Sequence, residues 1–125
     1  AEKLGITVFV TGSMPEEEYQ KLLIDQAIME CMTNCARHAG GTRVFVKITN
    51  NKVLCKVQIT NNGKKPAEGS QEGGGLTSLR KTVEREGGKM QVIFSPEFEL
   101  ILLLSHEKDR EIKSSEEVPV KILNR

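Results

Sequence analysis

The stretch QEGGGLTSLRKTVEREGGKMQV, residues 71–92, has glycines on both sides of a helical pattern. Gly87 and Gly88 follow the pattern, where glycine ends helices in the left-handed conformation at little steric cost. Gly73–Gly75 precede it, and three successive glycines indicate a backbone that another group approaches closely. Backbone N–H groups at a helix start can bind phosphate, so the triplet is a candidate anion site. A flexible linker is the alternative for the same glycines.

Strand and helix patterns alternate along the rest of the chain. Ser13 is a plausible N-cap for a long first helix, with Pro15 in its first turn and Gly40-Gly41 after its end. In order, we predict a strand at 6–11, a helix to Ala39, strands at 42–49 and 52–60 joined by a tight Asn50-Asn51 hairpin, a polar loop at 61–75, a helix at 76–86, and strands at 90–94 and 98–105. This order predicts an α+β fold, a two-layer sandwich of one mixed sheet with helices on one face.

Apolar periodicity predicts which positions form the core. The expected buried positions are Ile28, Met32, Cys35, Ala36 and Ala39 on the first helix, Val53, Cys55, Val57 and Ile59 on the third strand, and Leu76, Leu79 and Val83 on the second helix. These sets follow helical spacing in the helices and alternation in the strand, so one side of each element is expected to face the sheet or the helices.

Composition favours one globular domain of ordinary chemistry. The chain has 125 residues, with 18 Lys and Arg against 17 Asp and Glu, so it has no footprint for nucleic acid or a membrane surface. No apolar run reaches the length of a membrane helix, and the N-terminus has no signal-peptide layout and reads as the interior of a larger protein. We expect a domain at 1–105 and a charged tail at 106–125.

Three cysteines, an odd number, suit a reducing cytosol rather than a disulfide framework. Cys31 and Cys35 are four residues apart on the predicted first helix, so both can face one side. Metal binding there is the less favoured interpretation, because no second ligand pair accompanies them and buried free cysteine is common.

A polar stripe runs along the first helix beside its apolar positions. Its members are Glu30, Asn34, Arg37 and His38. A carboxylate can take a proton, an asparagine carbonyl is a hard oxygen ligand for Mg²⁺, and arginine and imidazole suit phosphate oxygens. The alternative is a solvated face on which Glu30 forms a salt bridge with Arg37.

A second polar cluster follows the predicted third strand. QITNNG at 58–63 ends the strand, and the glycine triplet opens the next helix after a short polar loop. The triplet is neither a Walker loop, because no Lys-Ser/Thr pair follows it, nor a dinucleotide fingerprint. The two clusters, in this order and with this spacing, are far more specific together than apart.

With both clusters in view, the chain resembles the catalytic and ATP-binding domain of bacterial sensor histidine kinases, in the superfamily shared with gyrase and MutL. ECMTNCARHAGGT at 30–42 is similar to the family's N box, TNNG at 60–63 to its G1 box, and GGGLTSLRKTVEREGG at 73–88 to its G2 box with the following helix. The resemblance covers residues 2–105, and the short linker between the G boxes is similar to subfamilies with a minimal ATP lid.

The resemblance implies a role for each matching position, with ATP and Mg²⁺ as the cofactors. Glu30 would orient or deprotonate the reacting group. The ligand contacts would be Asn34 to Mg²⁺, Arg37 and His38 to phosphate oxygens, Gly63 beside adenine, and Gly73 and Gly75 at the hinge of the lid, with Leu76 at the start of its helix.

One position departs from the family pattern. The G1 aspartate that reads the adenine amine is Asn61 here, which can still accept a hydrogen bond but carries no charge. The resemblance further implies that the phosphoacceptor histidine belongs to a dimerisation domain preceding residue 1, and that a response regulator is the downstream partner. A non-catalytic docking module of the same fold and a stand-alone serine kinase of the anti-sigma-factor type are the alternatives.

Overall fold

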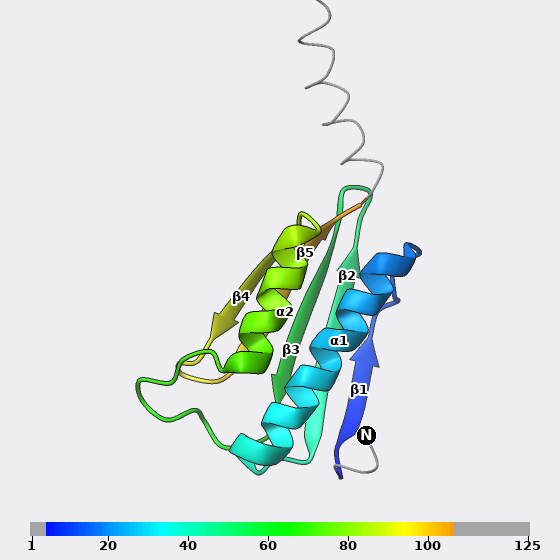
Figure 1. Cartoon of the computed structure of the whole chain (residues 1–125). Helices are drawn as coiled ribbons and strands as arrows, with labels where there is room; N and C mark the ends of the chain where they lie inside the picture. The colour runs from blue at the N-terminus through cyan, green and yellow to red at the C-terminus, as the bar shows by residue number, and fades with distance from the viewer. Residues whose placement is uncertain (1–4, 107–125) are drawn as a thin grey trace, which may run out of the picture.

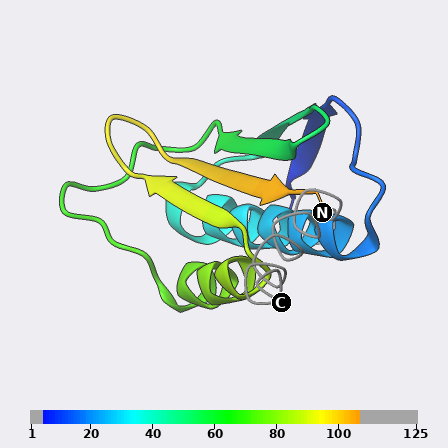
Figure 2. The ribbon, with the colours of Figure 1, turned by 90° about the horizontal axis from the view of Figure 1, so that it is seen from above.

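Two helices cover one face of a five-stranded mixed sheet in the computed structural model, which describes residues 5–106 (Figures 1 and 2). The elements are β1 (Thr7–Thr11), α1 (Glu18–Asn34), the π-helical turn η2 (Cys35–Ala39), β2 (Arg43–Asn50), β3 (Leu54–Asn61), α2 (Gly74–Arg85), β4 (Lys89–Ile93) and β5 (Glu99–Ser105). The predicted α+β two-layer sandwich is confirmed. The predicted tail lies outside the described residues, apart from His106.

The strands lie in the order β1-β2-β3-β5-β4, with β1 parallel to β2 and every other neighbouring pair antiparallel. The parallel pair is possible because α1 returns the chain across the sheet between β1 and β2. Antiparallel β4 and β5 form the closing hairpin that the sequence predicts. This order puts β1 at one edge of the sheet and β4 at the other.

Alternation along the strands builds the core, because every second side chain faces the helices. The buried positions are Val44, Val46 and Ile48 on β2, Cys55, Val57 and Ile59 on β3, and Leu100, Leu102 and Leu104 on β5. The pattern predicted for the third strand is therefore correct at three positions. It is wrong at Val53, which precedes β3 and is exposed.

The first helix begins later than the sequence predicts. Its N-cap is Glu17, whose side chain makes no capping hydrogen bond, and Ser13 lies in the preceding segment. Of the predicted core stripe, Met32 and Cys35 are buried, whereas Ile28, Ala36 and Ala39 are only partly buried. The helix instead centres its buried face on Leu23, Ile24, Ala27 and Cys31.

The helix also ends differently from the prediction of one α-helix to Ala39. The α-helical geometry stops at Asn34, and Cys35–Ala39 form a π-helical turn that Gly40 closes with a left-handed φ of 63°. A π turn is wider than an α turn and is frequent at functional sites. It changes where the side chains after Asn34 point.

Local chemistry explains the other boundaries. The second helix begins at Gly74, two residues earlier than predicted, and it buries Leu76, Leu79 and Val83 as expected. Gly87 follows it with φ 86°, in the left-handed conformation predicted there. The β2–β3 hairpin has no asparagine at positive φ; instead the side-chain Oδ1 of Asn51 accepts hydrogen bonds from the N–H groups of Val53 and Leu54.

Neither helix in residues 5–106 has both the length and the apolar composition that crossing a membrane would require.

Candidate functional site

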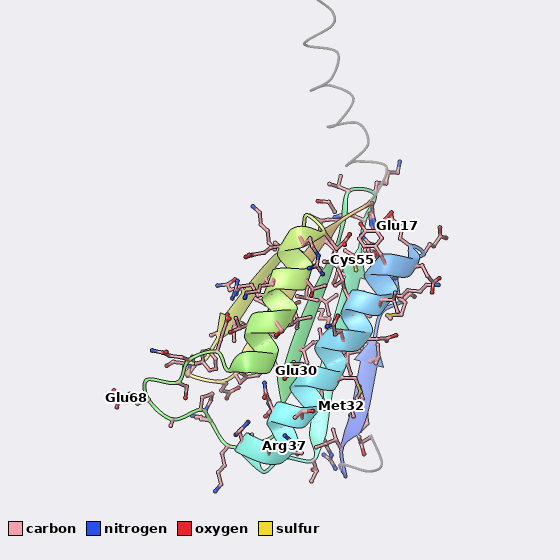
Figure 3. The ribbon with its side chains drawn as sticks, viewed as in Figure 1. Glu17, Glu30, Met32, Arg37, Cys55 and Glu68 are labelled. Atoms are coloured by element: carbon pink, nitrogen blue, oxygen red, sulfur yellow. The ribbon has the colours of Figure 1, made fainter. Side chains whose placement is uncertain are left out.

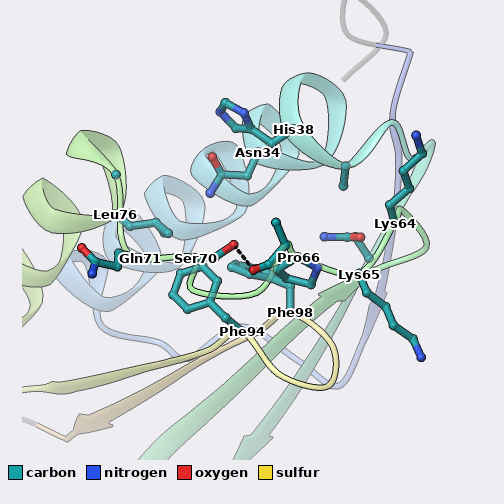
Figure 4. Close-up of a pocket in the computed structure, with 14 residues that line it drawn as sticks. Asn34, His38, Lys64, Lys65, Pro66, Ser70, Gln71, Leu76, Phe94 and Phe98 are labelled. Carbon is teal, nitrogen blue, oxygen red and sulfur yellow. Dashed lines mark hydrogen bonds between the residues drawn. The ribbon is translucent and has the colours of Figure 1, made fainter.

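A pocket of about 460 Å³ lies where the end of α1, the loop after β3 and the β4–β5 hairpin meet (Figure 4). It is lined by Asn34, His38, Ala39, Asn61, Lys64, Lys65, Pro66, Ala67, Ser70, Gln71, Gly73, Leu76, Phe94 and Phe98. Residues from both of the sequence clusters singled out above therefore face one cavity, although the two clusters are far apart along the chain.

The pocket has a polar side and an aromatic side. Asn34 and His38 lie on one side, and Phe94 and Phe98 lie on the opposite one (Figure 4). The two phenylalanine rings pack edge to face with centroids 5.9 Å apart. Such a surface accepts a flat apolar group, because aromatic rings favour stacked and edge contacts. Sequence reasoning missed both rings and treated them only as the ends of two strands.

The charged groups that line the pocket are all basic. Lys64 and Lys65 come from the loop directly after Gly63, and none of the fourteen lining residues is an aspartate or a glutamate. Opposite charge attracts an anionic ligand, and an uncompensated pair of lysines suits phosphate. The sequence contains the signal, since NNGKKP joins these lysines to the polar cluster, but our interpretation did not use it.

The structure divides the predicted polar stripe of the first helix. Asn34 and His38 line the pocket, whereas Glu30 and Arg37 are absent from its lining. Arg37 is exposed on the wide turn, and Glu30 lies on the side of α1 that faces α2 (Figure 3). Within residues 5–106 no ion pair joins Glu30 to Arg37, so the salt bridge considered as the alternative does not form.

Glu30 contacts the glycine triplet directly. A Cβ atom added at Gly75 would overlap the Glu30 carboxylate, while the corresponding positions at Gly73 and Gly74 have no neighbour within 4 Å. The carboxylate thus lies against the first turn of α2, where the helix dipole stabilises negative charge. Of the three glycines, only Gly75 is closely approached by another group, and that group is the end of a side chain of this protein.

Asn61 and Gly63 form a tight turn at the end of β3. The Asn61 Oδ1 atom accepts a hydrogen bond of 2.7 Å from the N–H of Gly63. A side chain at Gly63 would overlap Ala39 of the π turn, so glycine is needed there for protein packing. A contact between Gly63 and adenine stays a prediction.

Asn62 ties this turn to the start of β2. Its Oδ1 accepts hydrogen bonds from the N–H groups of Thr42 and Arg43, at 2.9 and 2.8 Å. The N–H of Lys64 also donates to the carbonyl of Ala39 at 2.8 Å. These bonds hold the π turn and the residues after β3 together.

The cysteines take no part in the pocket. Cys31, Cys35 and Cys55 are buried free thiols, and burial raises the pKa of Cys31 to about 12. Burial therefore disfavours the thiolate, which is the form that binds a metal. Within the described range, no three side chains of His, Cys, Asp or Glu gather in a way that could hold a metal ion.

No protein-family model matches the sequence. Solved structures do match. The histidine kinase domain of a blue-light activated histidine kinase from Erythrobacter litoralis superposes with a TM-score of 0.66 at 16% identity, over 86% of this chain and 54% of that one. The ATP-binding domain of PrrB from Mycobacterium tuberculosis gives 0.58 at 23% identity, over 81% and 80%. The histidine kinase AdeS of Acinetobacter baumannii gives 0.62 at 12% identity, over 85% and 57%.

These likenesses define the class of fold. The chain has the mixed-sheet α+β fold of histidine kinase ATP-binding domains, and it spans about half the length of the Erythrobacter and Acinetobacter chains. The resemblance first noted in the N-box and G-box residues thus extends to the three-dimensional arrangement.

Proposed function

We propose that this chain is the ATP-binding catalytic domain of a sensor histidine kinase of two-component signalling. It binds Mg-ATP and donates the γ-phosphoryl group to a histidine on a separate dimerisation domain, from which a response regulator receives it. The observation that carries the proposal is the composition of the pocket: two lysines, two phenylalanines, Asn34 and no carboxylate, in this fold. We also propose a cytoplasmic location for this kinase, which the three free cysteines favour.

The parts of a nucleotide correspond to different sides of the pocket. Phe94 and Phe98 offer an apolar surface for the base, and Asn61 offers a hydrogen-bonding group at the end of β3. Lys64, Lys65 and His38 offer positive charge or N–H donors for the phosphates. Phosphoryl transfer needs positioning and charge neutralisation more than covalent chemistry from the protein, and these groups supply both.

Asn34 is the residue that would hold Mg²⁺. Its side-chain carbonyl is a suitable oxygen ligand, but a carboxylate is absent from the pocket lining, so phosphate oxygens and water would provide the other ligands. The metal and the nucleotide should therefore bind together. Mg²⁺ supplies charge neutralisation across the phosphates when it is bound.

We propose that Glu30, which lies next to the residues that line the pocket, orients or deprotonates the reacting group. Its carboxylate lies against Gly75, two residues after Gly73, which does line the pocket. The acceptor side chain would enter near the start of α2. General base catalysis requires a base within hydrogen-bonding reach of the proton that it removes, and a carboxylate at this position would meet that requirement.

The direct test is calorimetric titration of the 125-residue chain with Mg²⁺ and a non-hydrolysable ATP analogue, alongside a GTP analogue. We expect saturable binding that prefers adenine and needs Mg²⁺. The Asn34→Ala variant should lose the Mg²⁺-dependent part of binding, at least about tenfold in affinity, because it removes the proposed metal ligand. Its thermal unfolding should stay close to that of the parent, and Thr33→Ala, next to the site but outside the lining, serves as the control.

A non-catalytic docking module of the same fold remains the second candidate, and one observation favours it. Asn61 replaces the aspartate of the family pattern, and its oxygen already accepts the N–H of Gly63. Absence of nucleotide binding at millimolar ligand, in a folded sample, would support the docking module and reject the kinase. Parent-like nucleotide affinity in Asn34→Ala would instead reject only the N-box assignment.

A further inference from the structure

The edge strand β1 lacks the charged residues and prolines that often protect a sheet edge. Its sequence, TVFVT, contains no charged residue and no proline, and β1 has only β2 as a neighbour among the described strands. Phe9 is 46% exposed on the face away from the helices, and Val10 is 49% exposed on the opposite face. Unprotected apolar edges of this kind pair with strands of other chains.

The backbone of β1 offers a defined set of free groups. The N–H of Thr7 donates to the carbonyl of Thr42, next to β2, over 2.9 Å. Because successive residues of a strand direct their N–H and C=O groups to alternate sides, Phe9 and Thr11 also face β2, whereas Val8 and Val10 face the open edge. The open edge therefore presents two donors and two acceptors.

The sequence of β1 reads the same in both directions. A two-fold axis at Phe9 would place Phe9 opposite the partner's Phe9 and Val8 opposite the partner's Val10. We propose that two copies of this chain associate through antiparallel pairing of β1 with β1, joining the two five-stranded sheets into one continuous sheet. This inference does not depend on the proposed kinase function.

The palindromic sequence of β1 and the positions of its free backbone groups favour the same pairing register. Val8 and the partner's Val10 form a hydrogen-bonded pair, and the symmetry repeats it, so all the free groups of Val8 and Val10 in both copies are satisfied. Phe9 falls at the non-hydrogen-bonded position, where side chains approach most closely. The Phe9 ring already stacks on Phe45 with centroids 5.6 Å apart, so the contact creates a row of four aromatic rings across the outer face.

The association leaves the pocket open. The pocket is formed beside the β4–β5 hairpin, and β1 and β4 lie at opposite edges of the sheet (Figures 1 and 4). Both copies can therefore bind ligand while they are paired.

Site-specific cross-linking tests the register. In Phe9→Cys, the two introduced thiols lie about 4.5 Å apart between Cα atoms at the two-fold axis, within disulfide range. Oxidation should give a disulfide-linked dimer at several-fold higher yield than Val53→Cys, an exposed control in the β2–β3 hairpin, outside β1. Thr7→Cys alone should not cross-link, since its two copies lie roughly 13 Å apart. Mixed with Thr11→Cys it should cross-link.

The native cysteines should not form competing disulfides in this test, because all three are buried. Sedimentation of the unmodified chain over a wide concentration range gives an independent measurement. We expect a reversible dimer that Val10→Lys abolishes and that Val53→Lys, at nearly equal exposure, does not. A monomer at every concentration, or cross-linking as efficient at Val53 as at Phe9, overturns the proposal.

Discussion

The pocket has two walls that are built in different ways. The anchored wall, residues 34–41 and 61–64, is held by backbone and side-chain hydrogen bonds that link the π turn, the end of β3 and the start of β2. The loop wall, residues 65–73, follows Lys64 and contains Glu72 near its other end. Before Glu72, the hydrogen bonds of the loop wall are those of a local turn, in which the N–H and the hydroxyl of Ser70 donate to the carbonyl of Ala67.

The two walls are therefore suited to different roles: the anchored wall positions its side chains, and the loop wall can change its conformation. The anchored wall carries Asn34, His38 and Asn61 at places that the packing fixes, whereas the loop wall carries Lys65 and Gln71 on a segment with few bonds to the sheet. Segments with few buried contacts open more readily than packed ones. We therefore expect the anchored wall to set where a ligand binds, and the loop wall to close over it.

Breaking the anchored wall should have the largest effect. In Gly63→Ala, the added methyl group overlaps Ala39 and cannot be accommodated without moving the π turn. Overpacking of this kind costs about 1–3 kcal/mol. Denaturant unfolding should show this loss of free energy of unfolding, and calorimetry should show weaker nucleotide binding because His38 is displaced.

Gly73→Ala is the matched control for this change. Its Cβ meets nothing within 4 Å, and the N-cap preference for glycine opposes the entropy gained from alanine, so stability should change by about 0.5 kcal/mol or less. Equal destabilisation by the two substitutions would show that Gly63 is not under the packing constraint described above.

Gly75→Ala should separate activity from stability. The new Cβ displaces the Glu30 carboxylate, which can swing away at little cost, while alanine raises helix propensity by about 0.5–1 kcal/mol. We expect phosphoryl transfer to a supplied histidine domain to fall about a hundredfold with no loss of stability. If the effect acts through Glu30, Gly75→Ala in a Glu30→Gln background should cause little further loss.

Asn61→Asp tests whether a residue of the anchored wall contacts the base of the nucleotide. One carboxylate oxygen keeps the bond to the Gly63 N–H, and the second oxygen is available to the adenine amine as a charged acceptor. Charge-assisted hydrogen bonds are stronger than neutral ones, so the adenine analogue should bind about tenfold tighter. The gain should be smaller or absent for the GTP analogue. Weaker adenine binding would mean that Asn61 does not read the base.

The fold and half of the site follow from the sequence because they depend on local periodicity. Alternation in β3 and helical spacing in α2 identify Cys55, Val57, Leu79 and Val83 as core without any tertiary information. Asn34 and His38 likewise belong to one recognisable helical motif, and both reach the pocket.

The parts that the sequence did not predict depend on tertiary neighbours. Phe94 and Phe98 enter the site because the β4–β5 hairpin ends beside the loop, which no spacing within the hairpin reveals. The π turn differs from an α turn by one residue per bond, a change too small to alter the apolar pattern. The contact of Glu30 with Gly75 joins two helices that are far apart along the chain, so no local pattern predicts it.

Freeing the loop wall should have a small effect on stability. Arg80 on α2 forms an ion pair with Glu72 and donates to the carbonyl of Met90 at 2.6 Å, and the hydrogen bond that Arg80 donates to Glu72 raises the pKa of Arg80. Both partners are partly exposed, so Glu72→Gln should cost only about 1 kcal/mol or less. Amide hydrogen exchange in residues 65–73 should nevertheless become faster. The control is Glu84→Gln, which removes the other carboxylate near Arg80, 3.7 Å away, without touching the loop. Equal exchange in both variants would show that the Glu72 contact does not restrain the loop wall, and that its closure is governed by the turn at Ala67 and Ser70.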